Sequence, residues 1–290
     1  MMNSNWTKII VGLTAGVLAA GLIAGCGGAK EGGSSAAAGE GGKKVVNVAH
    51  TSHYVPYNFV NDKNESDGLE VAIMKEVAKK LPQYEFKFHP TSDDDLLIGV
   101  ESGKYDIGTK GIWKTPAREK KYIFTKNTTG ASVVGFVIRK EDEATIKNID
   151  DFAKAGKKLV PIAPQNAQYQ VVVDYNKAHP DTQIKLEASE NFQVADAYTW
   201  VMEGRYDGFF NIELSFKNNV VKDTGAYHKY ADKLTYFRYK AIPIYPLINK
   251  KDKKLAEEVD KALGELRQDG TIAKLETQYL GEEVDKLVKD

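Results

Sequence analysis

The sequence has few of the residues that form metal centres and hydrolytic active sites. Its 290 residues contain one cysteine, Cys26, and five histidines, of which only His50 and His53 lie close together. A single cysteine excludes a disulfide within the chain, and the scattered histidines form no plausible ligand set with acidic residues. No Gly-x-Ser-x-Gly or His-Glu-x-x-His motif is present. We therefore predict no cofactor, no metal and no catalytic residue, and take His53 as a loop residue near a cleft.

An excess of charge of one sign is also missing. The chain has 40 lysine and arginine residues against 40 aspartate and glutamate residues, so its formal net charge is zero. Lys8 is the only charged residue before Cys26, so a chain processed at that cysteine would carry 39 basic against 40 acidic side chains. Nucleic-acid-binding proteins carry a basic surface, and no nucleic-acid partner is therefore predicted.

A long hydrophobic run occurs at the N-terminus. Lys8 precedes IIVGLTAGVLAAGLIAG, which ends in small residues directly before Cys26. This order is typical of a secretory signal with a lipobox, although Ile23 stands where leucine is usual. A membrane span needs about 20 apolar residues, and this run is short for that; a simple secretory signal is the other alternative. We predict a signal peptide over 1–25 and lipidation of Cys26.

The segment after Cys26 is rich in glycine, serine and alanine and reads GGAKEGGSSAAAGEGG. Such a composition cannot bury apolar surface, so residues 26–43 are predicted to form a flexible tether. A lipid, a tether and a globular body together indicate a protein anchored in the cell membrane, on the extracytoplasmic face.

Strand-like and helix-like patterns alternate through the rest of the chain, which is long enough for two domains. KVVNVAH, residues 44–50, has the pattern of a buried strand, and EFKF, residues 85–88, alternates like another. Between them, apolar residues recur at helical spacing until Pro82 stops the pattern; they are Leu69, Ile73, Val77 and Leu81. This order predicts the α/β class, with parallel sheets covered by helices.

Two short stretches of the chain resemble each other, VESGKYD at 100–106 and VMEGRYD at 201–207. Each has the pattern of a helix end, a glycine suited to a left-handed cap, and a Tyr-Asp pair entering an apolar stretch. Either the likeness is chance, or two lobes of the protein use the same helix-to-strand unit.

Two long strand-like runs, ASVVGFVIRK and AIPIYPLINK, flank the central block of the sequence. If both cross between lobes, residues 44–140 and 237–290 form lobe 1, and residues 141–236 form an inserted lobe 2. Open α/β sheets bind ligands at the carboxyl ends of their strands, so the two lobes are expected to face a shared cleft.

The stretch TKGIWKTPAREKKYIFT, residues 109–125, places Arg118 just past a Thr-Pro pair at the start of a predicted helix. A guanidinium at this position either pairs with a surface acid such as Glu119 or holds an anion delivered to it. Its planar five-donor fork is suited to grip a carboxylate through two hydrogen bonds.

Five stretches of the chain occur in a characteristic order: HYVPYNFVND, DGLEVAIMKEVAKKLP, GVESGKYDIGTKGIWKTPAREKKYIFT, EGRYDGFFNIELSF and LGELRQDGTIAKLETQYLG. Through them, over about residues 45–284, the chain resembles the bacterial extracellular solute-binding proteins, family 3, which deliver polar amino acids to ABC importers. The resemblance implies a two-lobed periplasmic-binding-protein-like fold of type II, each lobe a sheet flanked by helices, with two crossing strands as the hinge. It also implies a small-molecule amino acid and an ABC permease as partners of a monomer.

The family's ligand loop implies site residues in lobe 1. Its arginine clamps the α-carboxylate of the bound amino acid, and Arg118 holds that position. Gly111 is retained, but Trp113 replaces a small hydroxyl residue, so either the backbone amide suffices there or the indole forms a wall for a large ligand. Lys110 is either solvated or reaches a second anionic group. Tyr54 aligns with the aromatic residue that covers the ligand's side chain, with loop packing as the alternative.

Lobe 2 departs from the family pattern at the acceptor for the α-ammonium group. Ile212 stands where the family has an aspartate, between Asn211 and Glu213. A buried charge without a partner costs several kcal/mol, so Glu213 is our predicted acceptor unless it is solvated or caps a helix. Asn166 lies where lobe 2 presents hydroxyl and amide groups to the carboxylate, and a helix N-terminus at this position would suit an anion.

The arrangement of Asn211 and Glu213 resembles the cystine-binding branch of the family, and cystine is our preferred ligand. Cysteine, glutamine and a basic amino acid stay open. Two other functions also stay open: a few dehydratases share this fold, and a surface lipoprotein of this kind could act as a sensor or dock to another membrane protein.

Overall fold

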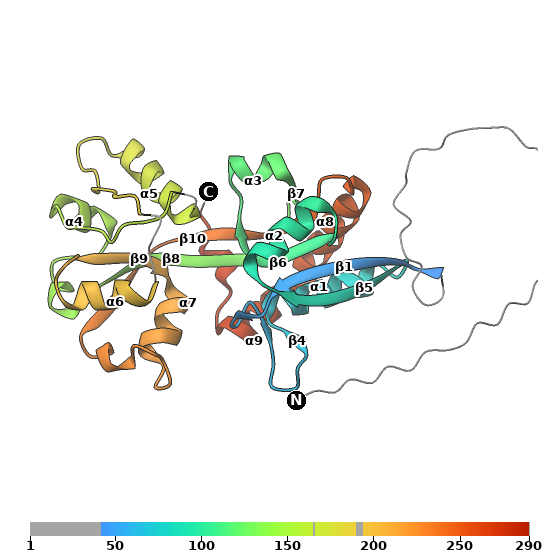
Figure 1. Cartoon of the computed structure of the whole chain (residues 1–290), viewed down its shortest axis with the longest axis horizontal. Helices are drawn as coiled ribbons and strands as arrows, with labels where there is room; N and C mark the ends of the chain where they lie inside the picture. The colour runs from blue at the N-terminus through green and yellow to red at the C-terminus, as the bar shows by residue number, and fades with distance from the viewer. Residues whose placement is uncertain (1–41, 165, 190–193, 290) are drawn as a thin grey trace, which may run out of the picture. The chain divides into compact units, whose positions relative to one another are not determined.

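The computed structural model describes residues 42–164, 166–189 and 194–289 (Figure 1). The chain divides into two units, Met1–Ser35 and Ala36–Asp290, and the described residues all belong to the second. The predicted signal peptide, the lipidation site Cys26 and nearly all of the predicted tether lie outside the described residues. Within the described part, no helix is long and apolar enough to cross a membrane.

A parallel group of strands forms the first half of the fold. β1 (Lys44–Thr51) pairs in parallel with β5 (Tyr84–Thr91) and with β6 (Ile107–Trp113). The helix α1 (Leu69–Lys80) packs beside them because Leu69, Ile73 and Val77 lie on one face and are fully buried. The predicted strands at 44–50 and 85–88 and the predicted helix are therefore confirmed.

Two antiparallel strands carry the sheet onward. β8 (Gly130–Arg139) pairs with the first part of β10 (Leu234–Asn249), whose later part pairs with β6 and with β7 (Tyr122–Phe124). β8 also pairs with β9 (Gly208–Ile212). The strand order is β5-β1-β6-β10-β8-β9, so the seven-stranded sheet is continuous through β10. The second predicted run begins earlier than expected, at Leu234.

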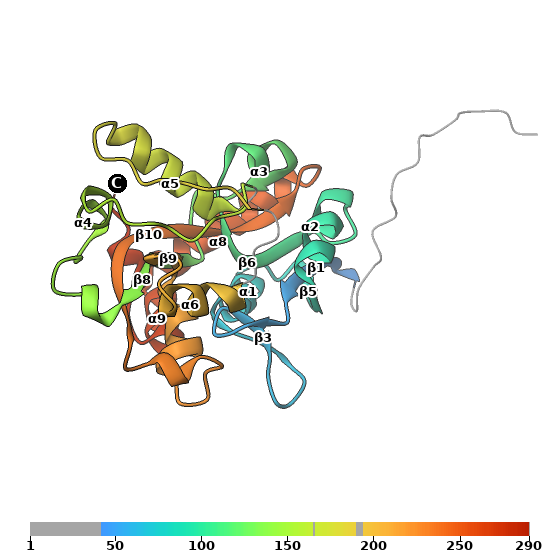
Figure 2. The same cartoon turned by 60° about the vertical axis from the view of Figure 1, so that its left-hand side comes forward.

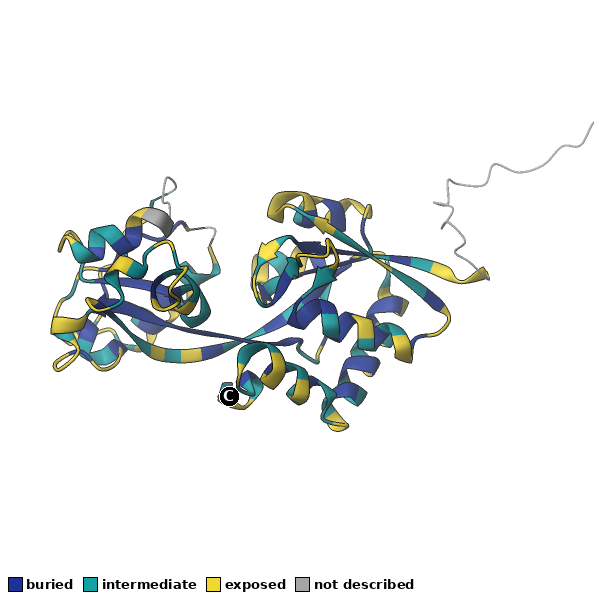
Figure 3. Cartoon of the chain, turned by 90° about the horizontal axis from the view of Figure 1, so that it is seen from below, coloured by how far each residue is buried: buried dark blue, intermediate teal, exposed yellow. Residues whose placement is uncertain are grey.

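The helices divide between the two ends of this sheet, as Figure 2 shows from a second side: α1 and α2 lie by β1 and β5, and α4, α5 and α6 lie by β8 and β9. Buried residues concentrate along the strands, and every residue of β8 except Arg139 is buried (Figure 3). The other elements are β2 (His53–Tyr54), β3 (Asn58–Val60), β4 (Ser66–Asp67), α2 (Asp93–Ser102), α3 (Pro116–Lys121), α4 (Ile149–Lys154), α5 (Ala167–Ala178), α6 (Val194–Met202), α7 (Glu213–Phe216), α8 (Lys253–Gln268), α9 (Thr271–Leu280), the 3₁₀ turns Lys140–Asp142, His228–Tyr230 and Val284–Leu287, and the π-helical turn Lys217–Val221.

The two similar stretches of sequence form the same local structure. Gly103 caps α2 with φ of 90°, and Gly204 follows α6 with φ of 72°, both in the left-handed region that favours glycine. Each is followed by a Tyr-Asp pair that leads into a strand, β6 in one case and β9 in the other. The predicted left-handed caps are confirmed.

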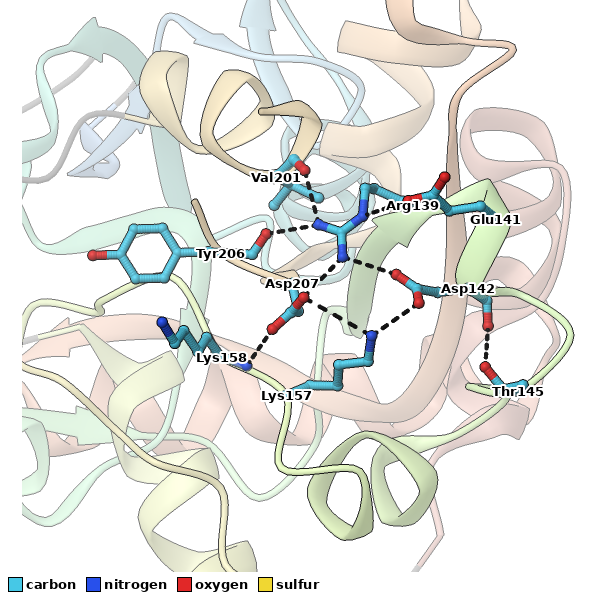
Figure 4. Close-up of polar contacts among 9 residues, drawn as sticks. All are labelled: Arg139, Glu141, Asp142, Thr145, Lys157, Lys158, Val201, Tyr206 and Asp207. Carbon is cyan, nitrogen blue, oxygen red and sulfur yellow. Dashed lines mark hydrogen bonds and ion pairs between the residues drawn. The ribbon is translucent and has the colours of Figure 1, made fainter. Parts of the chain in front are cut away.

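The aspartates of these stretches accept backbone hydrogen bonds in the same way. Asp106 accepts a hydrogen bond from the backbone N–H of Asn47 at 2.7 Å, and Asp207 accepts one from that of Lys158 at 2.8 Å. Asp207 also holds the guanidinium of Arg139 at 2.8 Å (Figure 4). A repeated helix-to-strand unit thus ends in a carboxylate that holds the backbone beside it, which is β1 in one case and the loop before Leu159 in the other.

Candidate functional site

Four strands end at one cavity. It has a volume of about 600 Å³, and its lining includes the last residues of β1, β5, β6 and β9, which are Thr51, Thr91, Trp113 and Ile212. We call it the main cavity. Ligands in open α/β sheets bind at the carboxyl ends of strands, so the main cavity lies where the topology expects a ligand. Six of the predicted site residues line it: Tyr54, Lys110, Gly111, Trp113, Arg118 and Asn166.

Arg118 enters the main cavity from the short helix α3. Thr115 caps this helix by accepting a hydrogen bond from the backbone N–H of Arg118 at 3.3 Å, and Pro116 occupies its first position. The guanidinium is half-buried and donates a hydrogen bond to the carbonyl of Trp113 at 2.9 Å. Burial lowers the pKa of Arg118 from its usual value, but a guanidinium stays charged.

No described carboxylate pairs with Arg118. Glu119, the surface acid that the sequence offered as an alternative partner, pairs instead with Lys114 at 3.2 Å. The remaining donors of the guanidinium, beyond the bond to the Trp113 carbonyl, therefore have no anionic partner among the residues that the structure describes.

Gly111 allows Tyr54 to pack against the backbone of the ligand loop. Its φ is 64°, and a Cβ at this position would lie 2.8 Å from the Tyr54 ring. Tyr54 in turn stacks on Tyr57 with ring centroids 5.0 Å apart, and the Tyr57 hydroxyl donates to the carbonyl of Ala131 in β8 at 2.9 Å. The aromatic wall of the main cavity is thereby fixed to β8.

Trp113 lies between two cavities. Its side chain is buried, with 5% of the residue exposed, and it lines the main cavity as well as a neighbouring cavity of about 380 Å³. Lys114 lines only the neighbouring cavity. The indole thus contributes an apolar surface at this end of the main cavity.

The second half of the fold contributes uncharged groups. Asn166 is the N-terminal cap of α5 but makes no side-chain capping hydrogen bond, and it lines the main cavity with Ala167, Gln168 and Ile212. The prediction that Asn166 stands at a helix N-terminus is confirmed. Such a terminus presents backbone N–H groups that suit an anion.

Asn211 and Glu213 are not among the residues that line the main cavity. Because side chains alternate along a strand, Ile212 faces the cavity while its neighbours point elsewhere. Asn211 donates to the hydroxyl of Tyr198 at 3.0 Å, and Glu213 pairs with Arg238 at 2.7 Å. For Glu213 to accept a ligand's ammonium group, as the sequence predicted, this ion pair would have to open.

Sequence reasoning missed a buried acid beneath the ligand loop. Glu70 is fully buried in α1 and accepts hydrogen bonds from Asn58 at 2.5 Å, from the backbone N–H of Gly111 at 2.7 Å and from Thr129 at 2.8 Å. Burial raises its pKa to about 7. The signal in the sequence was an acid between Leu69 and Val71, two apolar residues of a buried helix turn.

Two further residues of the main cavity were missed. Asp93, the first residue of α2, forms an ion pair with Lys110. Thr51 is 5% exposed, and its hydroxyl oxygen has no hydrogen-bond partner among the described residues. Within the same residues there is no group of three His, Cys, Asp or Glu side chains that could hold a metal ion.

A cavity at the strand ends of a two-part α/β fold, with an unpaired arginine and an aromatic wall, is the arrangement of a solute-binding protein. The family model for bacterial extracellular solute-binding proteins, family 3, matches residues 46–282. The chain belongs to this family, and the resemblance stated from its motifs is confirmed.

Individual relatives agree with this assignment. The chain is 26% identical over 262 residues to the L-cystine-binding protein TcyK of Bacillus subtilis, covering 88% of this chain and 91% of TcyK. Among solved structures, the probable amino-acid ABC transporter extracellular-binding protein ytmK of B. subtilis matches with a TM-score of 0.66 at 23% identity, over 82% of this chain and 98% of that one. A structure from work on glutathione import via GshT and the cystine ABC importer TcyBC of Streptococcus mutans matches with a TM-score of 0.63 at 25% identity, over 86% and 98%. The type II fold with two crossing strands is therefore the fold of this protein.

Proposed function

We propose that this protein is the amino-acid-binding component of an ABC importer, that it is not an enzyme, and that its ligand is cystine. Arg118 clamps an α-carboxylate of the ligand, and the aromatic wall of Tyr54 with the indole of Trp113 encloses the rest. The names of the relatives support an amino-acid ligand, and those that name cystine support the choice of cystine.

The observation that carries the proposal is that the guanidinium of Arg118 has no anionic partner among the described residues. A half-buried guanidinium that lines a cavity and lacks a described anionic partner is costly unless an anion is supplied. A carboxylate offers the planar pair of acceptors that matches two guanidinium donors. In a closed site these charge-assisted bonds are shielded from water.

Closure of two lobes supplies that shielding. We take residues 44–140 and 237–290 as lobe 1 and residues 141–236 as lobe 2, connected by the paired strands β8 and β10. The main cavity has lining residues from both, so a ligand there would bridge them. Cys26 would carry the lipid that keeps the monomer near its permease in the membrane.

A thermal-shift titration tests the proposal. The chain without residues 1–26 retains the whole second unit, and it is titrated with cystine, cysteine, glutamine, arginine and glutathione. A ligand at 100 times its dissociation constant stabilises the folded state by about 2.7 kcal/mol. Truncating one partner of a buried charge pair costs about 2–5 kcal/mol of binding, so Arg118→Ala should abolish the shift.

The matched control is Arg205→Ala, which removes an exposed guanidinium that stacks on Trp200 and does not line the main cavity. This variant should keep the full shift. If no amino acid shifts the melting temperature, or if Arg118→Ala binds as tightly as the wild type, the proposed function is wrong. Binding together with normal import in a deletion strain would point to a sensor or docking role instead.

A further inference from the structure

The wall of the main cavity contains a Lys110–Asp93 ion pair, to which the proposed role of Arg118 gives no function. Lys110 comes from β6, where it is the only charged residue, and its side chain is 16% exposed. Asp93 comes from the first turn of α2, and its side chain is 63% exposed. The two side chains pair with each other, and both line the main cavity.

Stability does not explain this pair. An exposed ion pair contributes about 0–1 kcal/mol, and Lys110 loses hydration because most of its side chain is covered. Asp94 and Asp95 carry the same charge in the same helix turn as Asp93, which suits the N-terminal end of a helix, but neither lines the main cavity. Asp93 is the only carboxylate among the described residues that line it.

A cation and an anion held side by side form the complement of an α-amino-acid head group, which carries a carboxylate and an ammonium group. The carboxylate would bind Lys110 and the ammonium group would bind Asp93, each exchanging one ion pair for another. Among its described lining residues, the main cavity thus offers two cations, Arg118 and Lys110, and one anion. A single head group whose carboxylate binds Arg118 has only its ammonium group left, so it could exchange at most the Asp93 half of the pair and would leave Lys110 without an anion.

We propose that the Lys110–Asp93 pair is a second head-group subsite, so that the ligand has two polar ends: a carboxylate bound by Arg118 and an α-amino-acid head group bound by Lys110 and Asp93. This inference rests on the proposed function. Its chemical class includes two amino acids joined by a disulfide and γ-glutamyl peptides. Both kinds have a less polar middle, which can lie against the indole of Trp113, and sulfur packs favourably against aromatic rings.

Other features of the main cavity fit a ligand of this size. A volume of about 600 Å³ falls within the range of about 300–1,000 Å³ found for sites that enclose drug-sized ligands. Thr51, which also lines the main cavity, has a buried hydroxyl with no partner among the described residues, and this hydroxyl can accept a hydrogen bond from an ammonium group.

Calorimetric titration of the chain without residues 1–26 tests the subsite. The probes with two ends are cystine and glutathione, and the matched probes with one head group are S-methylcysteine and glutamine. The wild type should bind at least one two-ended probe ten-fold or more tightly than S-methylcysteine. Asp93→Asn and Lys110→Met should each weaken that probe at least ten-fold while changing the single-headed probes less than three-fold.

The control variants are Asp94→Asn, in the same helix turn, and Lys121→Met, which breaks the exposed pair with Glu101. Both should bind every probe as the wild type does, and Lys110→Arg should restore most of the affinity lost in Lys110→Met. Equal affinity for probes with one and two ends, or an equal loss of both in Asp93→Asn, would overturn the subsite.

The two proposals fail in different ways. If single-headed probes bind tightly, depend on Arg118 and are indifferent to Asp93, only the second subsite is wrong. If no probe binds the wild type, both the proposed function and the second subsite are wrong. A preference for cystine over glutathione, or the reverse, identifies which two-ended class the subsite serves.

Discussion

Glu70 should make the stability of this protein fall as the pH rises. The carboxyl group is fully buried, and burial raises its pKa from 4.5 to about 7. Between these two values the folded protein binds more protons than the unfolded chain, so the free energy of unfolding decreases with increasing pH and levels off above pH 7. The difference corresponds to about 3 kcal/mol in total, of which about 2.5 kcal/mol is lost between pH 5 and pH 8.

Glu70→Gln isolates this contribution because the amide fits the same bonds. Its carbonyl oxygen can accept from Asn58 and from the backbone N–H of Gly111, as one carboxyl oxygen does now. Its NH₂ group then faces Thr129, whose hydroxyl can turn to the carbonyl of Ile244, which lies 3.4 Å away. The variant should therefore fold and keep each of these groups hydrogen-bonded.

Urea unfolding of both proteins from pH 5 to pH 8 measures the effect. Burial raises the pKa of Glu276 to about 8, so part of the slope remains in both proteins, and the difference between the two curves reports Glu70. The curves should converge at low pH, with the variant about 2.5 kcal/mol less pH-dependent over this range. Parallel curves, or a variant that is less stable at pH 8, would mean that the three donors hold Glu70 ionised and that the reasoning is wrong.

Two other substitutions test the site, one at Gly111, which lines the main cavity, and one at Glu213, which does not. Gly111→Ala places a Cβ 2.8 Å from the Tyr54 ring at φ of 64°, and a left-handed alanine costs about 1–2 kcal/mol; we expect lower stability and weaker ligand binding. Gly156→Ala has φ of 62° and nothing within 4 Å, so it should lose stability alone. Glu213→Gln, which weakens the pair with Arg238, should change ligand affinity less than two-fold by calorimetry. A ten-fold loss would show that Glu213 reaches the ligand.

Elements with a strong internal period could be predicted from the sequence. α1 follows from the spacing of Leu69, Ile73 and Val77, and the caps at Gly103 and Gly204 follow from the need for a residue that tolerates positive φ. Loop residues follow no such repeating pattern, so the direction of their side chains cannot be predicted in this way. The Thr-Pro pair before Arg118 predicts that it lies at the start of a helix, but its selection as a site residue came from the resemblance to the family's ligand loop.

The partners of charged residues were harder to predict because they come from distant parts of the chain. Asp93 and Lys110 meet only because α2 and β6 pack together, and the pairing of Glu213 with Arg238 requires α7 to lie beside β10. Glu70 was missed for a different reason. A hydrophilic acid is normally expected at the surface. The three hydrogen-bond donors that allow Glu70 to be buried lie in other parts of the fold.

The charges of the main cavity come from one side of the fold. Arg118, Lys110 and Asp93 all belong to the part of the chain before residue 141, whereas the described lining residues from 141–236 are uncharged. A ligand can therefore satisfy its charged groups on the first side before the second side approaches. Since the described residues of the second side bring no side-chain charge to the cavity, closure need not remove such a charge from water, which would cost several kcal/mol per ion. What the second side can add is the N-terminus of α5 and the apolar side chain of Ile212. These groups favour a closed state only when an anion and an apolar segment are already present. An uncharged residue at Ile212 fits a division in which the first side would select the ligand's charges and the second side would enclose it.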